Sequence, residues 1–123
     1  MDLQEKLTAG EFVILAEMEP PKGTDVSAMV ASATSVKRTV DAFVVPEMSN
    51  AVMRLSSLGG SLLLQTKGLE TVMQVCCRDR NRLALQGDLL AAQARARAHA
   101  AAAALRRICL SGRTDRSHPR WRW

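Results

Sequence analysis

The feature of this sequence that most limits its fold is a set of short apolar runs at a constant spacing. The runs are residues 12–16 (FVILA), 42–45 (AFVV) and 72–76 (VMQVC), and their first residues lie 30 positions apart. They are almost continuously apolar, which is typical of strands buried on both faces of a parallel sheet. Aromatic residues make up only 3% of the chain, so we expect an aliphatic core.

Helical patterns fill the intervals between the runs. The first covers residues 24–38 and opens with the capping pair Thr24-Asp25. A second is predicted over residues 51–66, where Gly59-Gly60 either weakens the helix or lets it pack closely against the sheet. A third is predicted from residue 80 or 81 onward. This alternation of strand and helix is the βαβ pattern of an α/β protein.

Two architectures fit the alternation, an open doubly wound sheet and a (β/α)8 barrel. A dinucleotide-binding open sheet would carry G-x-G-x-x-G after its first strand, whereas residues 17–23 read EMEPPKG. A barrel needs roughly 250 residues, and residues 108–110 (ICL) are a candidate for a fourth strand. We therefore predict an α/β fold that is a partial (β/α)8 barrel of the TIM type, with about the first three to four βα units.

The charge is distributed unevenly and divides the chain in two. Residues 1–93 carry a net charge of −2, and residues 94–123 carry +7, all of it from arginine. Alanine fills ten of the fourteen positions 91–104. We predict that residues 1–93 are the barrel-like part and that residues 94–123 are a divergent Ala/Arg-rich tail. Because the basic balance belongs to the tail, nucleic-acid binding by the body is disfavoured.

The opening residues indicate a cytoplasmic protein with no membrane partner. Residues 1–6 carry both signs of charge without a following apolar segment of signal-peptide length, and residues 12–16 are far shorter than the roughly 18 residues of a membrane span. The cysteines, Cys76, Cys77 and Cys109, lack metal-ligand spacing. We predict that they are reduced, buried small residues and that the chain has no metal site.

The residues that follow each run are the candidates for chemistry, because function collects at the carboxyl ends of parallel strands. After the first run, Glu17 and Glu19 are candidates for a general acid and its neighbour. The alternative is that one pairs with Lys22 and the other is solvated. After the second run, Ser49 and Asn50 lie in a loop or cap the next helix.

Three arginines, Arg78, Arg80 and Arg82, follow the third run. Arginines at this edge can hold an anionic ligand or pair with carboxylates from neighbouring loops. The alternative is that Asp79 caps a helix and the arginines are solvated.

Several segments resemble those of methylenetetrahydrofolate reductases. Residues 17–25 (EMEPPKGTD) are similar to the family's first-strand motif, and residues 53–58 (MRLSSL) to part of its second helix. The most specific segment, residues 77–90 (CRDRNRLALQGDLL), resembles C-R-D-R-N-R-x-A-L-Q-x-D-L-L of the bacterial branch. The resemblance covers about residues 8–93 in the right order and spacing.

The resemblance implies a flavoprotein oxidoreductase of one-carbon metabolism that acts on CH–NH donors. In the family, a (β/α)8 barrel holds FAD, NAD(P)H reduces the flavin, and the flavin reduces 5,10-methylenetetrahydrofolate to 5-methyltetrahydrofolate. The protein places the cofactor and supplies a proton. The catalytic glutamate, which is the proton donor to the folate, falls on Glu17. Expected flavin contacts are Gln74, where well-known members have His, and the loop residues Ser49 and Asn50.

The resemblance weakens in two places. Pro46-Glu47 departs from the commoner Thr-based versions of the second-strand loop. Beyond residue 93 the likeness ends, although residues 108–112 resemble strand four and its flavin loop, which makes Gly112 a further candidate cofactor contact. Arg113 then stands where the family has Asp.

Three interpretations of the whole chain follow. The first is a truncated or frame-disrupted member of the family that is inactive alone and self-associates through exposed sheet edges. The second is half of a split enzyme whose other half is a separate chain. The third is a binding module in which residues 120–123 (RWRW) stack on nucleic-acid bases.

Overall fold

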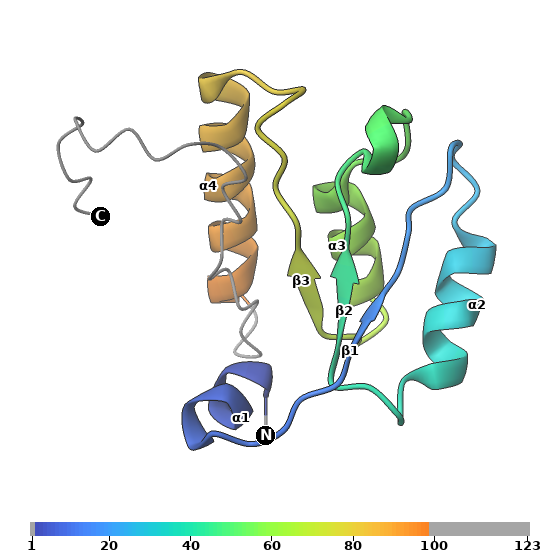
Figure 1. Cartoon of the computed structure of the whole chain (residues 1–123), viewed down its shortest axis with the longest axis vertical. Coiled ribbons are helices and arrows are strands. Elements are labelled where there is room, and N and C mark those ends of the chain that lie inside the picture. Colours follow the sequence, from blue (N-terminus) through green and yellow to red (C-terminus); the bar gives the residue numbers. More distant parts are fainter. Residues whose placement is uncertain (1, 99–123) are drawn as a thin grey trace, which may run out of the picture.

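The computed structural model describes residues 2–98, so the predicted strand at 108–110 and the candidate contact Gly112 lie outside the described residues. In chain order (Figure 1), the elements are α1 (Leu3–Ala9), β1 (Leu15–Glu17), α2 (Ser27–Val36), β2 (Ala42–Val45), the 3₁₀ turn η1 (Ser49–Ala51), α3 (Ser57–Gln65), β3 (Thr71–Met73) and α4 (Arg82–Ala98). The strands form a parallel sheet in the order β1-β2-β3. The prediction of an α/β fold with a parallel sheet is confirmed at this level.

The core lies between the sheet and two helices. Phe43 and Val45 of β2 are 2% and 0% exposed, and they project toward α2 and α3. The surrounding buried side chains come from these helices and from the turn before β3, and they are Met29, Ala33, Leu64 and Leu69. Figure 1 shows α3 behind the sheet, α2 beyond β1, and α4 on the opposite side next to β3. As expected from the composition, the core is aliphatic apart from Phe43.

Helix α3 packs on the sheet through small residues. Its buried positions are Ser57, Gly60, Ser61 and Leu64, which recur on one face of a helix. A Cβ added to Gly60 would lie 3.0 Å from Cγ1 of Val45, so any other residue would require Val45 or the helix to shift by a few tenths of an ångström. The second of the two predicted roles for this glycine pair, close packing, therefore holds for Gly60.

The second predicted helix begins six residues later than expected. Residues 49–51 form η1 instead, where Asn50 and Ala51 both have φ of 56°. The side chain of Ser56 accepts a hydrogen bond from the backbone N–H of Gly59 at 3.2 Å and so caps α3. Ser49 and Asn50 therefore do not cap a helix, and they belong to the loop that follows β2.

Strand β1 corrects the prediction that every run is buried on both faces. Phe12 is 88% exposed, Ile14 47% and Leu15 48%. β1 is an edge strand of the sheet, and one of its faces has no covering element among the described residues. Burial on both faces fits β2 far better, because β2 is central and three of its four residues are buried.

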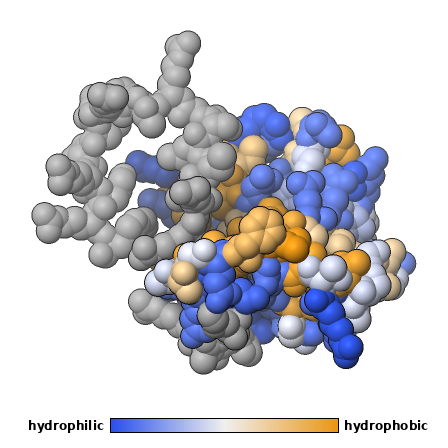
Figure 2. Space-filling view, turned by 60° about the horizontal axis from the view of Figure 1, so that its bottom comes forward, coloured by the Kyte–Doolittle hydropathy of each residue, from blue (hydrophilic) through white to orange (hydrophobic). Residues whose placement is uncertain are grey.

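Helix α1, which the sequence analysis did not anticipate, lies at the amino ends of the strands (Figure 1). The backbone N–H of Leu3 donates to Oε1 of Glu70 at 2.9 Å, and Lys6 pairs with Asp41. Both carboxylates stand just before strands, so α1 is tied to the starts of β2 and β3. Figure 2, which brings this end forward, shows apolar surface interspersed with polar surface.

Candidate active site at the carboxyl edge of the sheet

Toward its carboxyl edge, one face of the sheet has no covering element among residues 2–98 (Figure 1). Side chains alternate between the faces of a strand, and Phe43 and Val45 point into the core, so Val44 points the other way. Val44 is in register with Glu17 of β1 and with Val72 of β3, which makes these three side chains one row on the bare face. Val44 and Val72 are only half-buried and Glu17 is exposed. We call this surface the bare face.

Gln74 belongs to the next row of the bare face. Its backbone N–H donates to the carbonyl of Val45 at 3.0 Å, so strand pairing continues one residue beyond β3. Its side chain stands two residues after Val72 and is exposed. Two of the four predicted site residues that the structure describes, Glu17 and Gln74, are therefore brought to the same face, although they come from different strands.

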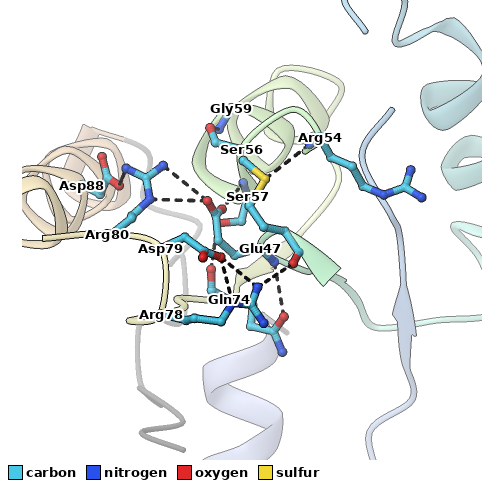
Figure 3. Close-up of polar contacts among 11 residues, drawn as sticks. Glu47, Arg54, Ser56, Ser57, Gly59, Gln74, Arg78, Asp79, Arg80 and Asp88 are labelled. Carbon is cyan, nitrogen blue, oxygen red and sulfur yellow. Dashed lines mark hydrogen bonds and ion pairs between the residues drawn. The ribbon is translucent and has the colours of Figure 1, made fainter. Parts of the chain in front are cut away.

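The side-chain amide of Gln74 has a defined orientation. Its Oε1 accepts a hydrogen bond from the backbone N–H of Glu47 at 3.3 Å, and its backbone carbonyl accepts one from Oγ of Ser57 at 2.7 Å (Figure 3). With Oε1 engaged, the Nε2 group keeps its two N–H donors for a ligand. Gln74 can thus donate hydrogen bonds at the carboxyl edge.

Glu47 is the candidate site residue that sequence reasoning missed. It is 7% exposed, and its Oε2 accepts a hydrogen bond from the backbone N–H of Ser57, at the start of α3, at 2.6 Å. A carboxylate at a helix N-terminus is favoured by the helix dipole. Its Oε1 lies 3.3 Å from a guanidinium nitrogen of Arg80, which also pairs with Asp88 of α4 at 2.7 Å. The available signal was a carboxylate two residues after a buried strand, together with arginines shortly after the next strand.

The arginines behind β3 have separate partners. Arg80 pairs with Glu47 of the loop after β2, which is one of the roles that the sequence left open for these arginines, and with Asp88 of α4. Arg78 pairs with Asp79 and donates to the carbonyl of Met48 at 3.0 Å (Figure 3). The hydrogen bond to Asp79, followed by the charge of Asp79, raises the pKa of Arg78.

Asp79 is engaged with Arg78 and does not cap the following helix. The hydrogen bond from Arg78 holds the pKa of Asp79 below its ordinary value. Oδ1 of Asn81 instead accepts the backbone N–H of Ala84 at 2.9 Å, in the first turn of α4. Arg82, the first residue of α4, is exposed.

Glu19 has a partner other than the expected Lys22. Its Oε1 lies 3.0 Å from Nε of Arg54, and Arg54 also donates to the carbonyl of Pro20 at 3.1 Å. The backbone N–H of Leu55 donates to the carbonyl of Pro21 at 2.8 Å. The segment before α3 therefore holds the Pro-Pro turn after β1. The side chain of Glu17 makes no hydrogen bond or ion pair with any described residue.

The other two predicted loop contacts are not drawn into this arrangement. Ser49 and Asn50 lie in η1, and among the described residues no side-chain hydrogen bond joins them to Glu17 or Gln74. The backbone of this turn is left-handed at Met48 and Asn50, with φ of 45° and 56°.

The cysteines differ from the predicted buried residues. Cys76 is half-buried and Cys77 is exposed, and both are free thiols. The physical reason is that β3 ends at Met73, so residues that were predicted to lie within or beside a buried strand lie in a loop. Cys109 lies outside the described residues.

Neither a cavity at the carboxyl edge nor a shallow hollow on α1 combines the size and the place of a flavin pocket. A cavity of about 10 Å³, roughly the room for one water molecule, lies at the carboxyl edge and is lined in part by Glu47, Gln74 and Arg80. A shallow hollow of about 540 Å³ lies at the opposite end, on α1, and its lining includes Asp2 and Glu5. The larger hollow is acidic and remote from the carboxyl edge, so the edge remains the better candidate.

Comparisons with models of protein families, with curated proteins and with solved structures gave no significant match. Among the described helices, none combines the length and the apolar character that crossing a membrane requires. Within the same part of the chain, no cluster of three or more His, Cys, Asp or Glu side chains is arranged to hold a metal ion.

Proposed function

We propose that residues 1–93 are the first βα units of a (β/α)8 barrel of the methylenetetrahydrofolate reductase type, in which the bare face lines the barrel interior. The observation that carries the proposal is the position of Glu17 and Gln74. These residues come from different strands, resemble the family's proton donor and a flavin contact, and share one uncovered face at the carboxyl edge. Active sites of such barrels lie at this edge.

The strand order is consistent with a barrel. In the order β1-β2-β3 each strand pairs with the strand that precedes it in the chain, as in a (β/α)8 barrel. A flavodoxin-like sheet would place β1 between β2 and β3. The first half of a dinucleotide-binding fold shares the observed order, but residues 17–23 lack its glycine fingerprint.

The residues of the bare face fit one wall of a flavin site. Val44 and Val72 offer an apolar surface for a flat ring, and Nε2 of Gln74 offers hydrogen-bond donors. When bound, FAD would supply the hydride transfer from NAD(P)H to 5,10-methylenetetrahydrofolate, giving 5-methyltetrahydrofolate. A complete site requires further walls, which the proposal assigns to the remaining βα units.

Glu17 is the residue that we assign to proton transfer. Its carboxyl group is exposed on the bare face, with no competing partner among the described residues. An oxygen of this carboxyl group can therefore carry a proton to a folate that lies over the face. The Pro-Pro turn after β1, which Arg54 holds in place, keeps the end of the strand in a fixed position.

A chimaera tests the proposal. Residues 1–93 are fused to βα units four to eight of a bacterial methylenetetrahydrofolate reductase, and the purified protein is scanned for flavin absorbance. We expect bound flavin and reductase activity, and we expect Gln74→Ala to weaken flavin retention. A folded, monodisperse chimaera without flavin would refute the proposal.

Exposed side chains on α4 support a second candidate, in which the remaining units come from a separate chain. Leu83 and Leu90 are 75% and 64% exposed and lie seven residues apart, on one side of the helix. To test this, the same units four to eight are co-expressed with the 123-residue chain as an independent polypeptide. Co-purification with flavin supports a split enzyme, and separate elution of the two chains excludes one.

A further inference from the structure

Two adjacent thiols occupy the loop behind β3, and the contacts described above give neither of them a role. Cys76 is half-buried and, together with Gln74 and Arg80, lines the cavity of about 10 Å³. Cys77 is exposed. One thiol is thus open to solvent while its neighbour is partly shielded, at the edge where the candidate active site lies.

A fixed cation accompanies the pair. Arg78 follows Cys77 directly, and its guanidinium is held by Asp79 at 2.8 Å and by the carbonyl of Met48 at 3.0 Å. Cationic neighbours and solvent access are the features that distinguish reactive cysteines from inert buried ones.

We propose that Cys76 and Cys77 form a peroxide-reactive dithiol, in which Cys77 is the attacking thiol and Cys76 the resolving thiol. The thiolate Sγ of Cys77 attacks one oxygen of hydrogen peroxide, the O–O bond breaks, and the hydroxide that leaves is protonated to water. Cys77 becomes a sulfenic acid. Sγ of Cys76 then attacks this sulfur, an S–S bond forms, and the sulfenic oxygen leaves as a second water. Two thiols are oxidised and one peroxide is reduced.

A disulfide between neighbouring residues is strained and therefore easily reduced. Consecutive Cα atoms lie about 3.8 Å apart, below the usual disulfide range of about 4.4–6.8 Å. The resulting strain makes the bond easier to reduce, which suits a switch rather than a structural crosslink. Oxidation would also alter the surroundings of Gln74. That consequence rests on the proposed function, whereas the oxidation itself does not.

Peptide mass spectrometry tests the proposal on the full chain carrying Cys109→Ser, which removes the third thiol. The protein is treated with peroxide, blocked with an alkylating reagent and digested with trypsin, so that residues 68–78 form one peptide containing both cysteines. We expect this peptide to lose both alkylation sites and two hydrogens, and to regain both sites after glutathione treatment. Oxidation of Met73, in the same peptide, adds an oxygen and is thereby distinguished.

Variants separate the two roles. In Cys76→Ser, Cys77 should accumulate as a sulfenic acid that a cyclic diketone traps, and in Cys77→Ser, Cys76 should remain alkylatable. Arg78→Gln should slow the reaction several-fold, Arg78→Lys should keep it, and Arg82→Gln, which removes an exposed arginine nearby, should leave it unchanged.

Three outcomes would overturn the proposal. They are two alkylatable thiols after peroxide treatment, a Cys77 sulfinic acid beside an unmodified Cys76, and a crosslink between chains in place of the internal bond. None of these readouts depends on bound flavin, so failure of the dithiol and failure of the proposed reductase function are distinguishable.

Discussion

Gly60 lies where α3 comes closest to the sheet, and its missing side chain sets the distance between the two layers. The neighbouring Val45 is β-branched and fully buried, so its Cγ1 has little room to move away from an added Cβ. Pro20 closes the other side, with Cγ at 3.4 Å from that Cβ. The absence of a side chain at position 60 thus allows α3, β2 and the turn after β1 to pack closely together.

We expect Gly60→Ala to destabilise the fold by about 1–3 kcal/mol through overpacking, in spite of the better helix propensity of alanine. Gly87→Ala in α4 is the matched control, because a Cβ there meets no atom within 4 Å. The control should gain up to about 1 kcal/mol. Urea unfolding of both variants measures the difference, and a stabilised Gly60→Ala would show that the layers can separate without cost.

Glu17→Gln in the chimaera should abolish folate reduction while leaving flavin reduction by NAD(P)H intact, because only the folate half-reaction needs the proton. Glu19→Gln is the matched control, since Glu19 is engaged by Arg54. Stopped-flow measurement of each half-reaction decides between the outcomes. If both half-reactions survive in Glu17→Gln, the assigned role is wrong, and if both fail, Glu17 is structural.

At the scale of elements, α1 is attached to the sheet by charged groups that respond to acid. The hydrogen bond from Lys6, and then that from the backbone N–H of Ile14, lowers the pKa of Asp41. A lowered carboxyl pKa contributes stability above the ordinary carboxyl value, and this contribution is lost as the pH falls through the folded-state value. Burial raises the pKa of Glu70, which has the opposite sign and favours the folded state as the pH falls.

We therefore expect α1 to detach from the sheet progressively as the pH falls and Asp41, the partner of Lys6, becomes protonated. Asp41→Asn should bring the loosened state to neutral pH and flatten the pH dependence in the acid range. Amide hydrogen exchange of residues 3–9, corrected for the intrinsic pH dependence, measures both effects. Asp25→Asn is the control, because the lowered pKa of Asp25 arises within the turn before α2, from Ser27. An acid response that persists in Asp41→Asn would assign it to other groups.

Helix α4 depends on Arg80 for its connection to the carboxyl edge. Arg80→Met would leave the buried carboxylate of Glu47 without its cation, at a cost on the order of 1–3 kcal/mol, and would free Asp88 as well. Arg82→Met removes an exposed arginine from the same helix. Faster amide exchange in residues 82–95 is expected for the first variant only. Equal exchange in both variants would show that apolar contacts alone hold α4.

At the scale of the whole molecule, we expect the bare face and the free edges of the sheet to determine whether the chain binds flavin and whether it self-associates. We expect the 123-residue chain alone to bind no stoichiometric FAD, since the described residues provide one wall of a site, and to self-associate through exposed strands. Size-exclusion chromatography with an absorbance scan checks both points. A yellow, monodisperse monomer with methylenetetrahydrofolate reductase activity would contradict this prediction.

The sequence predicted those parts of the fold that depend on periodicity along the chain. β2 was placed correctly, β3 began within one residue of its predicted start, and α2 and α4 followed at their expected places. α1 was missed, although Asp2 and Glu5 form a capping box and Gly10 ends the helix. These are short-range signals, and a seven-residue helix without an apolar stripe gives no periodic pattern to support them.

The partners within the candidate site could not be predicted in the same way. Glu19 lies close in sequence to Lys22 but pairs with Arg54, and Glu47 pairs with Arg80, 33 residues further on. These ion pairs depend on how the loops pack at the carboxyl edge, and local sequence patterns do not reveal that packing. Placing Glu17 and Gln74 on the same face of the sheet required knowledge of the register of all three strands.

The order β1-β2-β3 also determines how this sheet can grow. Each strand pairs with the one synthesised just before it, and residues in register lie 27 and 28 positions apart, so every new pairing closes a loop of nearly the same modest length. Pairing can therefore keep pace with translation, one βα unit at a time, without waiting for distant segments. In the (β/α)8 barrel that we propose, each later strand would pair with the strand before it, and β1 would offer the last edge to be closed. Until such a barrel closed, the bare face and the free sheet edges would stay exposed, and we expect a chaperone to bind the nascent chain there.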